Sequence, residues 1–419
     1  MLILSHPTGN ANSRQNALAL LEAGLLAEFW TCLNWEPGAP LRALLPDSFR
    51  RTLDRRSFDE LDGALIRSHP WREVGRHLAS RLGVRSWYGD QDAPFSVDAV
   101  YRSLDRRVAG RLGQIRGLTG VFASEDGAQV SFEAARQAGL KCIYELPIGY
   151  WRAARELLVE EAQLNPAWAS TIPGNRDRAA KLERKDRELA GADHILVASS
   201  YTRATLEQAP GRLATISVIP YGAPPALVEL PVNGSKSSRL KVIYVGALTQ
   251  RKGISYFFDA VHRLREHVEV TVIGALPSTG CPALEAAISQ HRWIPTAPRE
   301  RVLEELAQQD VLVLPSLFEG FGLVILEALS QGVPVIATRH TGAPDVLTDG
   351  EDGYLVPIRS SQAIQEKLGI LLRSPDTVRS MKEAAWRKAR TLPWAAYRGR
   401  VTEMVRKTIC SAPADLVRD

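Results

Sequence analysis

Two glutamates, Glu319 and Glu327, stand with seven residues between them around a turn that contains Gly320 and Gly322. In the run VLVLPSLFEGFGLVILEALSQG (residues 311–332), the pattern predicts an apolar strand, a polar loop and an apolar helix. The first N–H groups of a helix lack intrahelical partners and carry partial positive charge, so such a loop suits an anion. Glycine has no Cβ, which lets a ligand approach the backbone. We therefore predict an anion-binding turn with one carboxylate in the loop and one on the helix.

The two carboxylates suit a ligand that carries hydroxyl groups on both sides of a diphosphate. Glu327 lies among apolar helix residues, and a carboxylate in such surroundings needs a hydrogen-bond partner. The diphosphate would take the helix N-terminus, and each carboxylate would accept hydrogen bonds from hydroxyls. The alternative is that Glu319 is a solvated loop residue and Glu327 the exposed stripe of an ordinary core helix.

Basic residues come from another strand–loop–helix unit of the same half. The stretch LKVIYVGALTQRKGISYFF predicts a strand that ends at Gly246, followed by Arg251 and Lys252 in front of a helix. A guanidinium and an ammonium beside a diphosphate would offset the charge that grows on a leaving group. The two residues could also form an ordinary exposed basic loop. Downstream, VEVTVIGA predicts the next strand, and HRWIP carries Trp293 and Ile294.

The N-terminal half predicts the same alternation of strand, loop and helix. Residues 2–5 (LILS) form the predicted first strand, and an amphipathic segment follows over residues 16–29. The loop between them carries Gly9, Asn10 and Asn12, which are candidate contacts for a phosphate or an acceptor. An ordinary capped loop is the alternative interpretation.

Further strands are predicted in this half at residues 31–35, 120–126, 141–147 and 194–199. Asp126 closes the second of these strands, and Glu145 lies near the end of the third. In doubly wound sheets, ligands bind outside the carboxyl ends of the strands. We therefore expect these two carboxylates to face a cleft.

The chain has the composition of a globular protein and the length of two domains. Of its 419 residues, 45% are hydrophobic and 24% are charged. The first domain is predicted over residues 1–215, a linker over 216–238 and a second domain over 239–390. The formal net charge of +5 permits an anionic ligand or a membrane surface without establishing either.

Cysteine usage and hydropathy exclude several other classes. The four cysteines (Cys32, Cys142, Cys281 and Cys410) lack CxxC spacing, so neither a zinc site nor a disulfide framework is predicted. No apolar run is long enough to predict a membrane span, and the N-terminus lacks the basic region of a signal peptide. We expect a reduced, cytoplasmic protein without a metal site.

Two stretches are interpreted mainly as solvated surface. Residues 36–115 carry paired arginines with Trp71, Trp87 and Tyr88 among them, which could bind anionic lipid headgroups or a lipid-diphosphate acceptor. A solvated helical surface is the favoured interpretation, and no recognised motif supports nucleic-acid binding. Residues 151–191 predict charged helix that is mostly solvated.

The run PSLFEGFGLVILEALSQGVPVIAT…TGAPDVLTDGEDGYLVP (residues 315–357) resembles the donor-binding core of the retaining glycosyltransferases of family four, the group 1 type. The resemblance includes the two glutamates with seven residues between them. It implies the GT-B fold: an α/β protein with two Rossmann-like, doubly wound domains that face each other across a cleft. It also implies a nucleotide-diphosphate sugar as donor, retention of anomeric configuration, and neither cofactor nor metal.

The resemblance assigns roles to individual residues. It implies that Glu327 holds the ribose hydroxyls, that Glu319 holds the sugar hydroxyls in catalysis, and that Arg251 and Lys252 hold the diphosphate. Backbone N–H groups of the loop should hold phosphate or sugar oxygens, and the HRWIP stretch should border the nucleobase. The other donor-side positions are Gly246, Trp293, Ile294, Gly320, Phe321, Gly322 and Leu323.

The resemblance also has implications for the remainder of the chain. Gly9 lies where the family brings its first loop to the cleft, with Asn10 and Asn12 on the acceptor side. Residues 391–419 resemble the family's C-terminal helix that crosses back to the first domain. The chain departs from the family where many members carry a histidine at a strand end of the first domain. Here those ends read SEDGA and YELPIGYW, and Asp126 or Glu145 is expected to take that place.

We therefore expect a retaining glycosyltransferase with a glycan or lipid-linked acceptor, in bacterial-type polysaccharide or glycoconjugate synthesis. Its expected location is cytoplasmic or in peripheral contact with the inner membrane face. The alternatives are a nucleotide-sugar epimerase of similar fold and a non-catalytic protein that binds nucleotides or sugars. A dinucleotide oxidoreductase is disfavoured because neither Gly9 nor Gly246 opens a GxGxxG motif.

Overall fold

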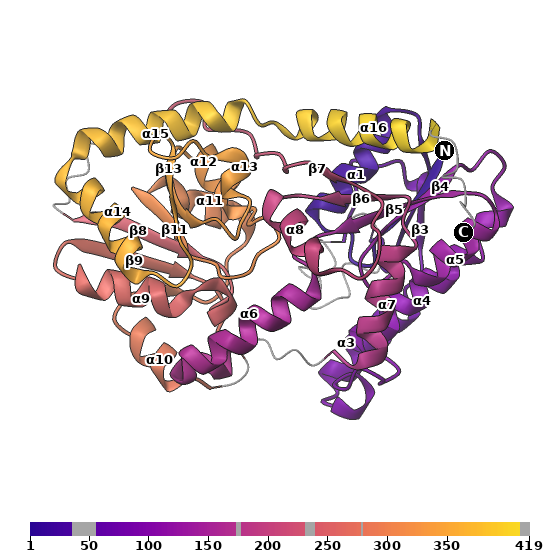
Figure 1. The fold of residues 1–419 in the computed structure, drawn as a ribbon, viewed down its shortest axis with the longest axis horizontal. Helices are drawn as coiled ribbons and strands as arrows, with labels where there is room; N and C mark the ends of the chain where they lie inside the picture. Colours follow the sequence, from indigo (N-terminus) through magenta and orange to yellow (C-terminus); the bar gives the residue numbers. More distant parts are fainter. Residues whose placement is uncertain (36–55, 173–176, 231–238, 278–279, 411–419) are drawn as a thin grey trace.

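The computed structural model describes residues 1–35, 56–172, 177–230, 239–277 and 280–410. It contains two parallel β-sheets with helices packed on them, side by side along the long axis of the molecule (Figure 1). This arrangement confirms the predicted α/β class with two doubly wound sheets.

The first sheet has the strand order β3-β2-β1-β4-β5-β6-β7, and all its pairings are parallel. Its core is formed by β1, β4 and β5, whose residues are buried on both faces, as expected for parallel strands covered by helices. The strands are β1 (Leu2–Ser5), β2 (Leu26–Thr31), β3 (Ile66–Ser68), β4 (Gly120–Ser124), β5 (Lys141–Leu146), β6 (His194–Val197) and β7 (Thr215–Val218).

The second sheet repeats this topology with the order β10-β9-β8-β11-β12-β13, again with parallel pairings. Its central strand β11 is fully buried, as the apolar run VLVL predicts. The strands are β8 (Leu240–Val245), β9 (Val268–Ile273), β10 (Arg292–Ile294), β11 (Val311–Leu314), β12 (Val335–Thr338) and β13 (Gly353–Val356).

Each sheet has one place where the strand order reverses direction. In the first sheet it lies between β1 and β4, and in the second between β8 and β11. The loops that leave two such strands diverge and open a crevice at their carboxyl ends, which is where open α/β sheets bind ligands. The topology therefore selects four loops as candidates for a functional site.

Helices of the N-terminal half connect and cover the first sheet. They are α1 (Ala11–Glu22), α3 (Trp71–Arg81), α4 (Val97–Ala109), α5 (Gln129–Gln137), α6 (Trp151–Leu164), α7 (Ala179–Ala190) and α8 (Ser200–Thr205), with 3₁₀ turns η2 (Gly63–Leu65), η3 (Arg85–Trp87), η4 (Leu112–Gln114), η5 (Pro166–Thr171) and η6 (Leu206–Gln208).

The C-terminal half contains its own helical elements, and the last two of them run along one side of the whole molecule. They are η7 (Gln250–Lys252), α9 (Ile254–Arg263), α10 (Pro282–Ile288), α11 (Arg299–Ala307), α12 (Val324–Ser330), α13 (Ala343–Val346), α14 (Ser361–Arg373), α15 (Pro375–Arg390) and α16 (Trp394–Cys410). In Figure 1, α15 lies over the second sheet and α16 over the first. The Tyr397 hydroxyl of α16 donates to Asn16 Oδ1 of α1 at 2.8 Å, which fixes this crossing.

The second strand begins earlier than its predicted position at residues 31–35. The first helix ends at Glu22, and Gly24 has a φ of 68°, a left-handed conformation that ends helices at low cost. β2 then runs over Leu26–Thr31. The amphipathic segment predicted at residues 16–29 therefore contains the end of a helix and the start of a strand.

The segment over residues 151–191 also differs from its predicted solvated surface. In Figure 1, α6 extends from the first sheet toward the second, and η5 at its far end packs on α10. Glu161 on α6 is fully buried, and so is Glu188 on α7. This segment is therefore a second connection between the two halves, in addition to α16.

The predicted linker over residues 216–238 is only partly described. β7 ends at Val218, so the first sheet continues past residue 215, where the predicted linker begins. Most of the polar stretch VNGSKSSR at residues 232–239 lies outside the described residues. Within the described ranges, none of the helices combines the length and apolar character needed to cross a membrane.

Candidate functional site

The crevice of the second sheet is bordered by the loop after β8 and the loop after β11. Gly246 follows β8 with a φ of 154°, and Gly274 follows β9. A Cβ on Gly274 would lie 1.9 Å from the Gly246 carbonyl oxygen, so the backbones of these two strand ends touch. Glycine is required here because no side chain fits between the strands.

The turn η7 brings Arg251 and Lys252 into this crevice. Gly253 follows it with a φ of 71°, and a Cβ there would lie 1.9 Å from the carbonyl oxygen of Pro315 in the loop after β11. The Arg251 carbonyl accepts N–H groups from Leu317 and Phe318, at 2.9 and 3.2 Å. The two loops of the crevice are thus joined through their backbones.

Both cations meet the carboxylate of Glu319. The Lys252 ammonium donates to Glu319 Oε2, and the Arg251 Nη1 atom lies 3.6 Å from the same oxygen. Arg251 Nη1 also donates to the Phe318 carbonyl at 2.7 Å. The structure therefore brings the adjacent pair Arg251 and Lys252 to Glu319, which lies 67 positions after Lys252 in the sequence.

The electrostatics of this cluster suit an anionic ligand. Burial lowers the pKa of Arg251, and burial together with the Arg251 charge lowers the pKa of Lys252 below its usual value. The lowered pKa values show that charge on these two side chains is unfavourable without a further anion, and an anionic ligand group would favour their charged forms.

The turn after Glu319 presents backbone donors. Across the described part of the chain, the N–H groups of Phe321, Gly322 and Leu323 have no acceptor. They lie at the start of α12, where the first N–H groups of a helix have no intrahelical partner. Gly322 has a φ of 86°, which permits this tight turn. The phenyl ring of Phe321 packs against Tyr221 with ring centroids 5.2 Å apart.

Glu327 occupies the first turn of α12, as predicted. Its Oε1 atom accepts a hydrogen bond from Arg299 Nε of α11 at 3.0 Å, and burial raises the pKa of its carboxyl. The predicted alternative of a solvated stripe does not describe a carboxylate this well covered. At the end of β10, Trp293 donates to the Gly274 carbonyl at 2.9 Å, and Ile294 is half-buried. These residues border the same edge of the second sheet.

The loop that carries Glu319 also contacts the first sheet. The Gly320 carbonyl accepts hydrogen bonds from the hydroxyls of Ser199 and Thr202, at 2.5 and 3.0 Å. A Cβ on Gly320 would lie 1.9 Å from the Pro147 carbonyl oxygen, just after β5. A Cβ on Gly149 would in turn lie 2.5 Å from the Phe318 ring. The donor-side loop is therefore held directly by the half that is expected to bind the acceptor.

The crevice of the first sheet begins at His6, which directly follows β1. Its Nδ1 atom accepts N–H groups from Thr8 at 3.2 Å and Gly9 at 3.0 Å. Burial and the charge of Arg56 lower the pKa of His6 to about 4. The imidazole is therefore neutral near pH 7, and its proton lies on Nε2 because Nδ1 is an acceptor.

The structure gives packing and capping roles to two of the predicted acceptor-side residues. Gly9 has a φ of 55°, and a Cβ there would lie 2.2 Å from the Phe58 ring. Asn10 is the N-cap of α1, with its Oδ1 atom accepting from Ser13 N at 2.9 Å. Asn12 differs, because its Oδ1 atom is buried with no hydrogen-bond partner in the described ranges.

Asp126 follows β4 and therefore lies at the first crevice, with a φ of 71°. Its carboxylate is ion-paired with Lys181 at 3.3 Å, and with Arg184 and Lys185 at 3.6 Å. Its backbone N–H donates to the buried carboxylate of Glu188. Asp126 therefore belongs to a charged cluster that it forms with three basic residues of α7.

Glu145 is buried elsewhere, on the face of the first sheet that α1 and α16 cover. Its carboxylate accepts from Ser124 Oγ at 2.8 Å, and burial raises its pKa. In the described ranges, neither Glu145 nor Asp126 contacts Glu319. The catalytic role predicted for either residue stays a prediction.

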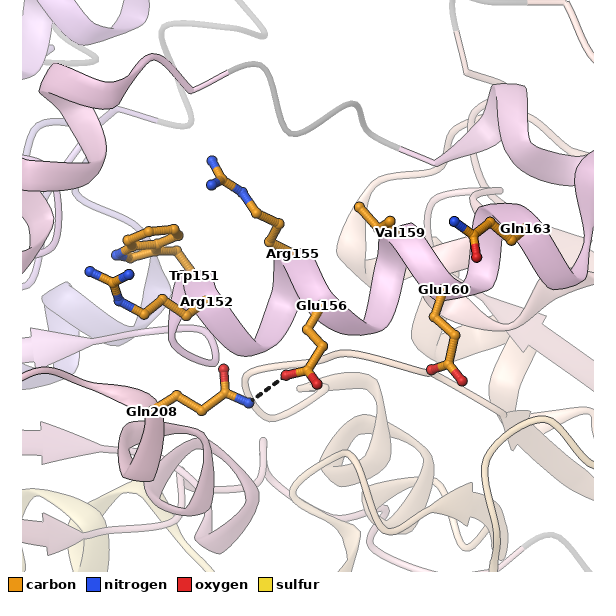
Figure 2. Close-up of a pocket in the computed structure, with 8 residues that line it drawn as sticks. All are labelled: Trp151, Arg152, Arg155, Glu156, Val159, Glu160, Gln163 and Gln208. Atoms are coloured by element: carbon orange, nitrogen blue, oxygen red, sulfur yellow. Dashed lines mark hydrogen bonds between the residues drawn. The ribbon is translucent and has the colours of Figure 1, made fainter.

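A groove of about 560 Å³ follows the exposed side of α6. Figure 2 shows Trp151, Arg152 and Arg155 at its end near the first sheet, and Glu160 and Gln163 toward the other end. It contains none of the predicted donor-side residues. Among the described residues, no cluster of three or more His, Cys, Asp and Glu side chains could hold a metal ion.

Comparison with known proteins bears on the second half of the chain. Residues 229–388 match the family model described as glycosyl transferases group 1. This segment is a group 1 glycosyl transferase domain. It contains Arg251, Lys252, Glu319 and Glu327, which confirms the resemblance carried by the two glutamates.

Curated relatives of this glycosyl transferase domain match part of the chain. A D-inositol 3-phosphate glycosyltransferase of Corynebacterium glutamicum is 31% identical over 187 residues, which are 42% of this chain and 45% of that protein. An alpha-maltose-1-phosphate synthase of Mycolicibacterium smegmatis is 26% identical over 273 residues, or 58% of this chain and 70% of that protein. The match thus spans less than half the length of the first of these relatives.

Solved structures of glycosyltransferases match nearly the whole chain. A sucrose-phosphate synthase from Thermosynechococcus elongatus superimposes with a TM-score of 0.66 at 17% identity, covering 98% of this chain and 99% of that one. HepE of Anabaena, solved in complex with UDP, gives a TM-score of 0.62 at 14% identity, covering 97% and 99%. At such identities the likeness establishes the fold alone. The chain has the GT-B fold.

Several residues at this site were missed from the sequence. His6 was overlooked although a histidine directly after the first predicted strand is a visible signal. Glu161 of α6, whose Oε2 atom lies 2.8 Å from Arg359 Nε, carried no signal, because nothing in a charged helix marks one glutamate as buried. The contact between Gly320 and Ser199 likewise joins two halves whose relative placement only the fold defines.

Proposed function

We propose that this protein is a retaining glycosyltransferase that moves a sugar from a nucleotide-diphosphate sugar to an acceptor. One observation carries the proposal. Arg251 and Lys252 converge on Glu319 in the crevice of a group 1 glycosyl transferase domain, beside three backbone N–H groups that find no acceptor among the described residues. This arrangement combines cations and neutral donors for a diphosphate with a carboxylate for hydroxyls.

The roles of the donor-side residues follow from their positions. Arg251 and Lys252 would bind the diphosphate and offset the charge that develops when the nucleoside diphosphate leaves. Glu319 would then exchange its contact with Lys252 for hydroxyls of the sugar. Glu327 would accept hydrogen bonds from the ribose hydroxyls, in a place where burial and Arg299 already hold its side chain.

For the chemical step we propose transfer on one face of the sugar, without a metal or other cofactor. The bond from the anomeric carbon to the diphosphate oxygen breaks, and the acceptor oxygen bonds to that carbon on the same face. The proton of the acceptor hydroxyl passes to the departing diphosphate. This route retains anomeric configuration without a protein nucleophile, and trapping of a covalent glycosyl-enzyme would contradict it.

The acceptor side is proposed to be the crevice of the first sheet. A glycan or lipid-linked acceptor of polysaccharide or glycoconjugate synthesis is the proposed second substrate. A cytoplasmic location, with peripheral contact at the inner membrane face, is part of the same proposal. His6 supports a polar acceptor here, because a neutral imidazole with its proton on Nε2 is a hydrogen-bond donor.

A thermal-shift screen against UDP, GDP, ADP and their common sugar conjugates tests the proposal. A ligand that binds only the folded protein stabilises it by about 2.7 kcal/mol at a hundred times its dissociation constant. One nucleotide should raise the melting temperature, and Glu327→Ala should strongly reduce the shift. The matching sugar conjugate should then be hydrolysed slowly when no acceptor is present.

Two outcomes would contradict the proposal. If no nucleotide raises the melting temperature, the crevice is not a donor site. If a nucleotide sugar binds but is neither hydrolysed nor transferred to any glycan, the protein is a binding module. Conversion of the sugar to its epimer without an acceptor would identify an epimerase instead.

A further inference from the structure

In helix α3 the burial of side chains is the reverse of that in an ordinary surface helix. Its buried residues are Glu73 and Ala79, whereas its large apolar side chains face outward. Trp71 is 50% exposed, Leu78 is 54% exposed and Leu82, which caps the helix, is 72% exposed. A surface helix normally buries its apolar face, so an outward apolar face requires an explanation.

The exposed apolar residues form one continuous stripe. Trp71, Val74, Leu78 and Leu82 are spaced by three, four and four residues, which places them on the same side of a helix. Trp87 of η3 extends the stripe, because Trp71 and Trp87 both pack against the Phe95 ring at centroid distances of 6.2 Å. These five exposed residues, Trp71, Val74, Leu78, Leu82 and Trp87, are called the α3 face below.

The exposed charges on α3 and η3 are basic, whereas the nearby exposed carboxylates of Asp90 and Asp92 are ion-paired with Arg178. Arg81 and Arg85 are exposed beside it, and between residues 69 and 89 the only carboxylate is Glu73, which is buried. The Glu73 carboxylate is ion-paired with Arg56 at 3.3 Å and with Arg76 at 2.9 Å. The exposed part of this segment therefore combines apolar side chains with arginines and presents no acid.

The α3 face is connected to the crevice of the first sheet. Glu73 holds Arg56, and the Arg56 guanidinium donates to the Thr8 carbonyl in the loop after β1. The helix itself begins three residues after β3, at the carboxyl edge of the sheet. In Figure 1, α3 lies at the lower margin of the molecule.

We propose that the α3 face docks this protein on an anionic lipid bilayer. An aromatic and aliphatic stripe that is flanked by arginines enters the interface between headgroups and acyl chains, while the arginines pair with anionic headgroups. Docking through α3 would place the carboxyl edge of the first sheet, with His6 and Asp126, next to the membrane. This inference deepens the proposed function, because it supplies the surface from which a lipid-linked acceptor would enter the acceptor crevice.

Flotation of the purified chain with vesicles tests the proposal. The protein should float with vesicles of phosphatidylcholine and phosphatidylglycerol, should float poorly with phosphatidylcholine alone, and should be released by salt. The double variant Leu78→Ser/Leu82→Ser should lose about tenfold or more of its vesicle affinity, because two apolar side chains leave the interface. Arg81→Gln and Arg85→Gln should each lower that affinity about fivefold.

The matched control is Val159→Ser/Leu164→Ser, which removes two exposed apolar side chains from α6 instead. This variant should float as the wild type does. Melting temperature and nucleotide affinity, measured in parallel, should stay unchanged in every variant, because α3 is remote from Arg251 and Lys252. Nucleotide binding without flotation would refute the docking alone, and flotation without nucleotide binding would refute only the proposed transfer.

Three results would overturn the proposal. The first is failure of the wild type to float with anionic vesicles. The second is equal flotation of the wild type and the Leu78→Ser/Leu82→Ser variant. The third is a concentration-dependent dimer that the same variant abolishes, since the α3 face would then bind a second copy of this chain.

Discussion

Glu161 of α6 is ion-paired with Arg359, with 2.8 Å between the Glu161 Oε2 and Arg359 Nε atoms. The carboxylate has no exposed surface, and its Oε1 atom accepts from Gln250 at 2.7 Å. Gln250 directly precedes Arg251, so a helix that starts at the first sheet holds the turn that carries the donor-side cations. The two halves of the protein are joined beside Arg251 and Lys252 as well as through α16.

The variant Glu161→Gln should destabilise the protein by about 3 kcal/mol, because it breaks a buried ion pair and leaves Arg359 without its main partner. Loss of the Glu161 contact should also loosen Gln250 and weaken nucleotide binding. Urea unfolding and nucleotide titration measure the two effects separately.

Glu160 provides a matched control one residue away. Its carboxylate pairs with the same Arg359 at 2.8 Å, but its side chain is 55% exposed. An exposed ion pair contributes about 0–1 kcal/mol, so Glu160→Gln should have little effect on unfolding or on nucleotide binding. Similar losses in the two variants would show that burial of Glu161 has no special role.

The two glutamates of the donor crevice should separate binding from transfer. Glu327→Ala removes an acceptor for ribose hydroxyls and should weaken nucleotide affinity about 10- to 100-fold, the value of hydrogen bonds to a charged group. Glu319→Ala should leave that affinity nearly unchanged or improve it, because Arg251 and Lys252 become free for the diphosphate. Transfer should nevertheless fall steeply. Titration of the nucleoside diphosphate together with an initial-rate assay measures both quantities.

Equal loss of nucleotide affinity in the two variants would overturn this division of roles. Lys252→Ala tests how much the positive charge of Lys252 contributes to binding. It should weaken binding of the nucleoside diphosphate more than binding of the nucleoside, because only the former carries the anionic groups.

Gly320→Ala should uncouple the donor loop from the first sheet. The added Cβ would lie 1.9 Å from the Pro147 carbonyl oxygen, and the backbone shift that relieves this clash would break the hydrogen bonds from Ser199 and Thr202. We expect a destabilisation of about 1–3 kcal/mol and a large loss of transfer. Nucleotide affinity should fall less than transfer, since the backbone shift would move the N–H groups after Gly320 but would leave the cations and Glu327 in place.

Gly399→Ala is the corresponding control. It lies inside α16, where an added Cβ would have no neighbour within 4 Å. Because alanine is the better helix former, this variant should be more stable by up to about 1 kcal/mol and fully active. Unimpaired transfer in Gly320→Ala would show that contact between the loop and the first sheet is dispensable.

His6 should make stability depend on pH in the acid range. Its pKa is about 4 in the folded protein and 6.5 when unperturbed, so the unfolded chain binds more protons between these values. The contribution of neutral His6 to the free energy of unfolding should therefore be fully present above about pH 6.5. It should be lost as the pH drops toward 4, by up to about 1.4 kcal/mol per pH unit. Urea unfolding across this range measures the slope.

His6→Asn isolates this contribution. An amide oxygen can still accept from the N–H groups of Thr8 and Gly9, but the side chain no longer titrates. The variant should lose the part of the pH dependence that one proton accounts for. An unchanged slope would show that folding does not lower the pKa of His6.

Local sequence pattern determined much of this fold. Short β-branched apolar runs such as VLVL at residues 311–314 favour buried strands, and glycines after them mark the loops at the strand ends. The two glutamates and the basic pair were identified because their residue types and spacing suit a diphosphate with hydroxyl groups. The start of β2 at Leu26 was placed wrongly, since one apolar segment contained both a helix end and a strand.

Only the tertiary structure decided which of these residues meet. Lys252 reaches Glu319 because two parallel strands, β8 and β11, are neighbours in the sheet. Glu161 is buried and the α3 face is exposed because of what packs against each helix, and a helical sequence pattern looks the same in both cases. Contacts between distant parts of the chain, such as Glu161 with Arg359, depend on how the two sheets are placed, which no local pattern encodes.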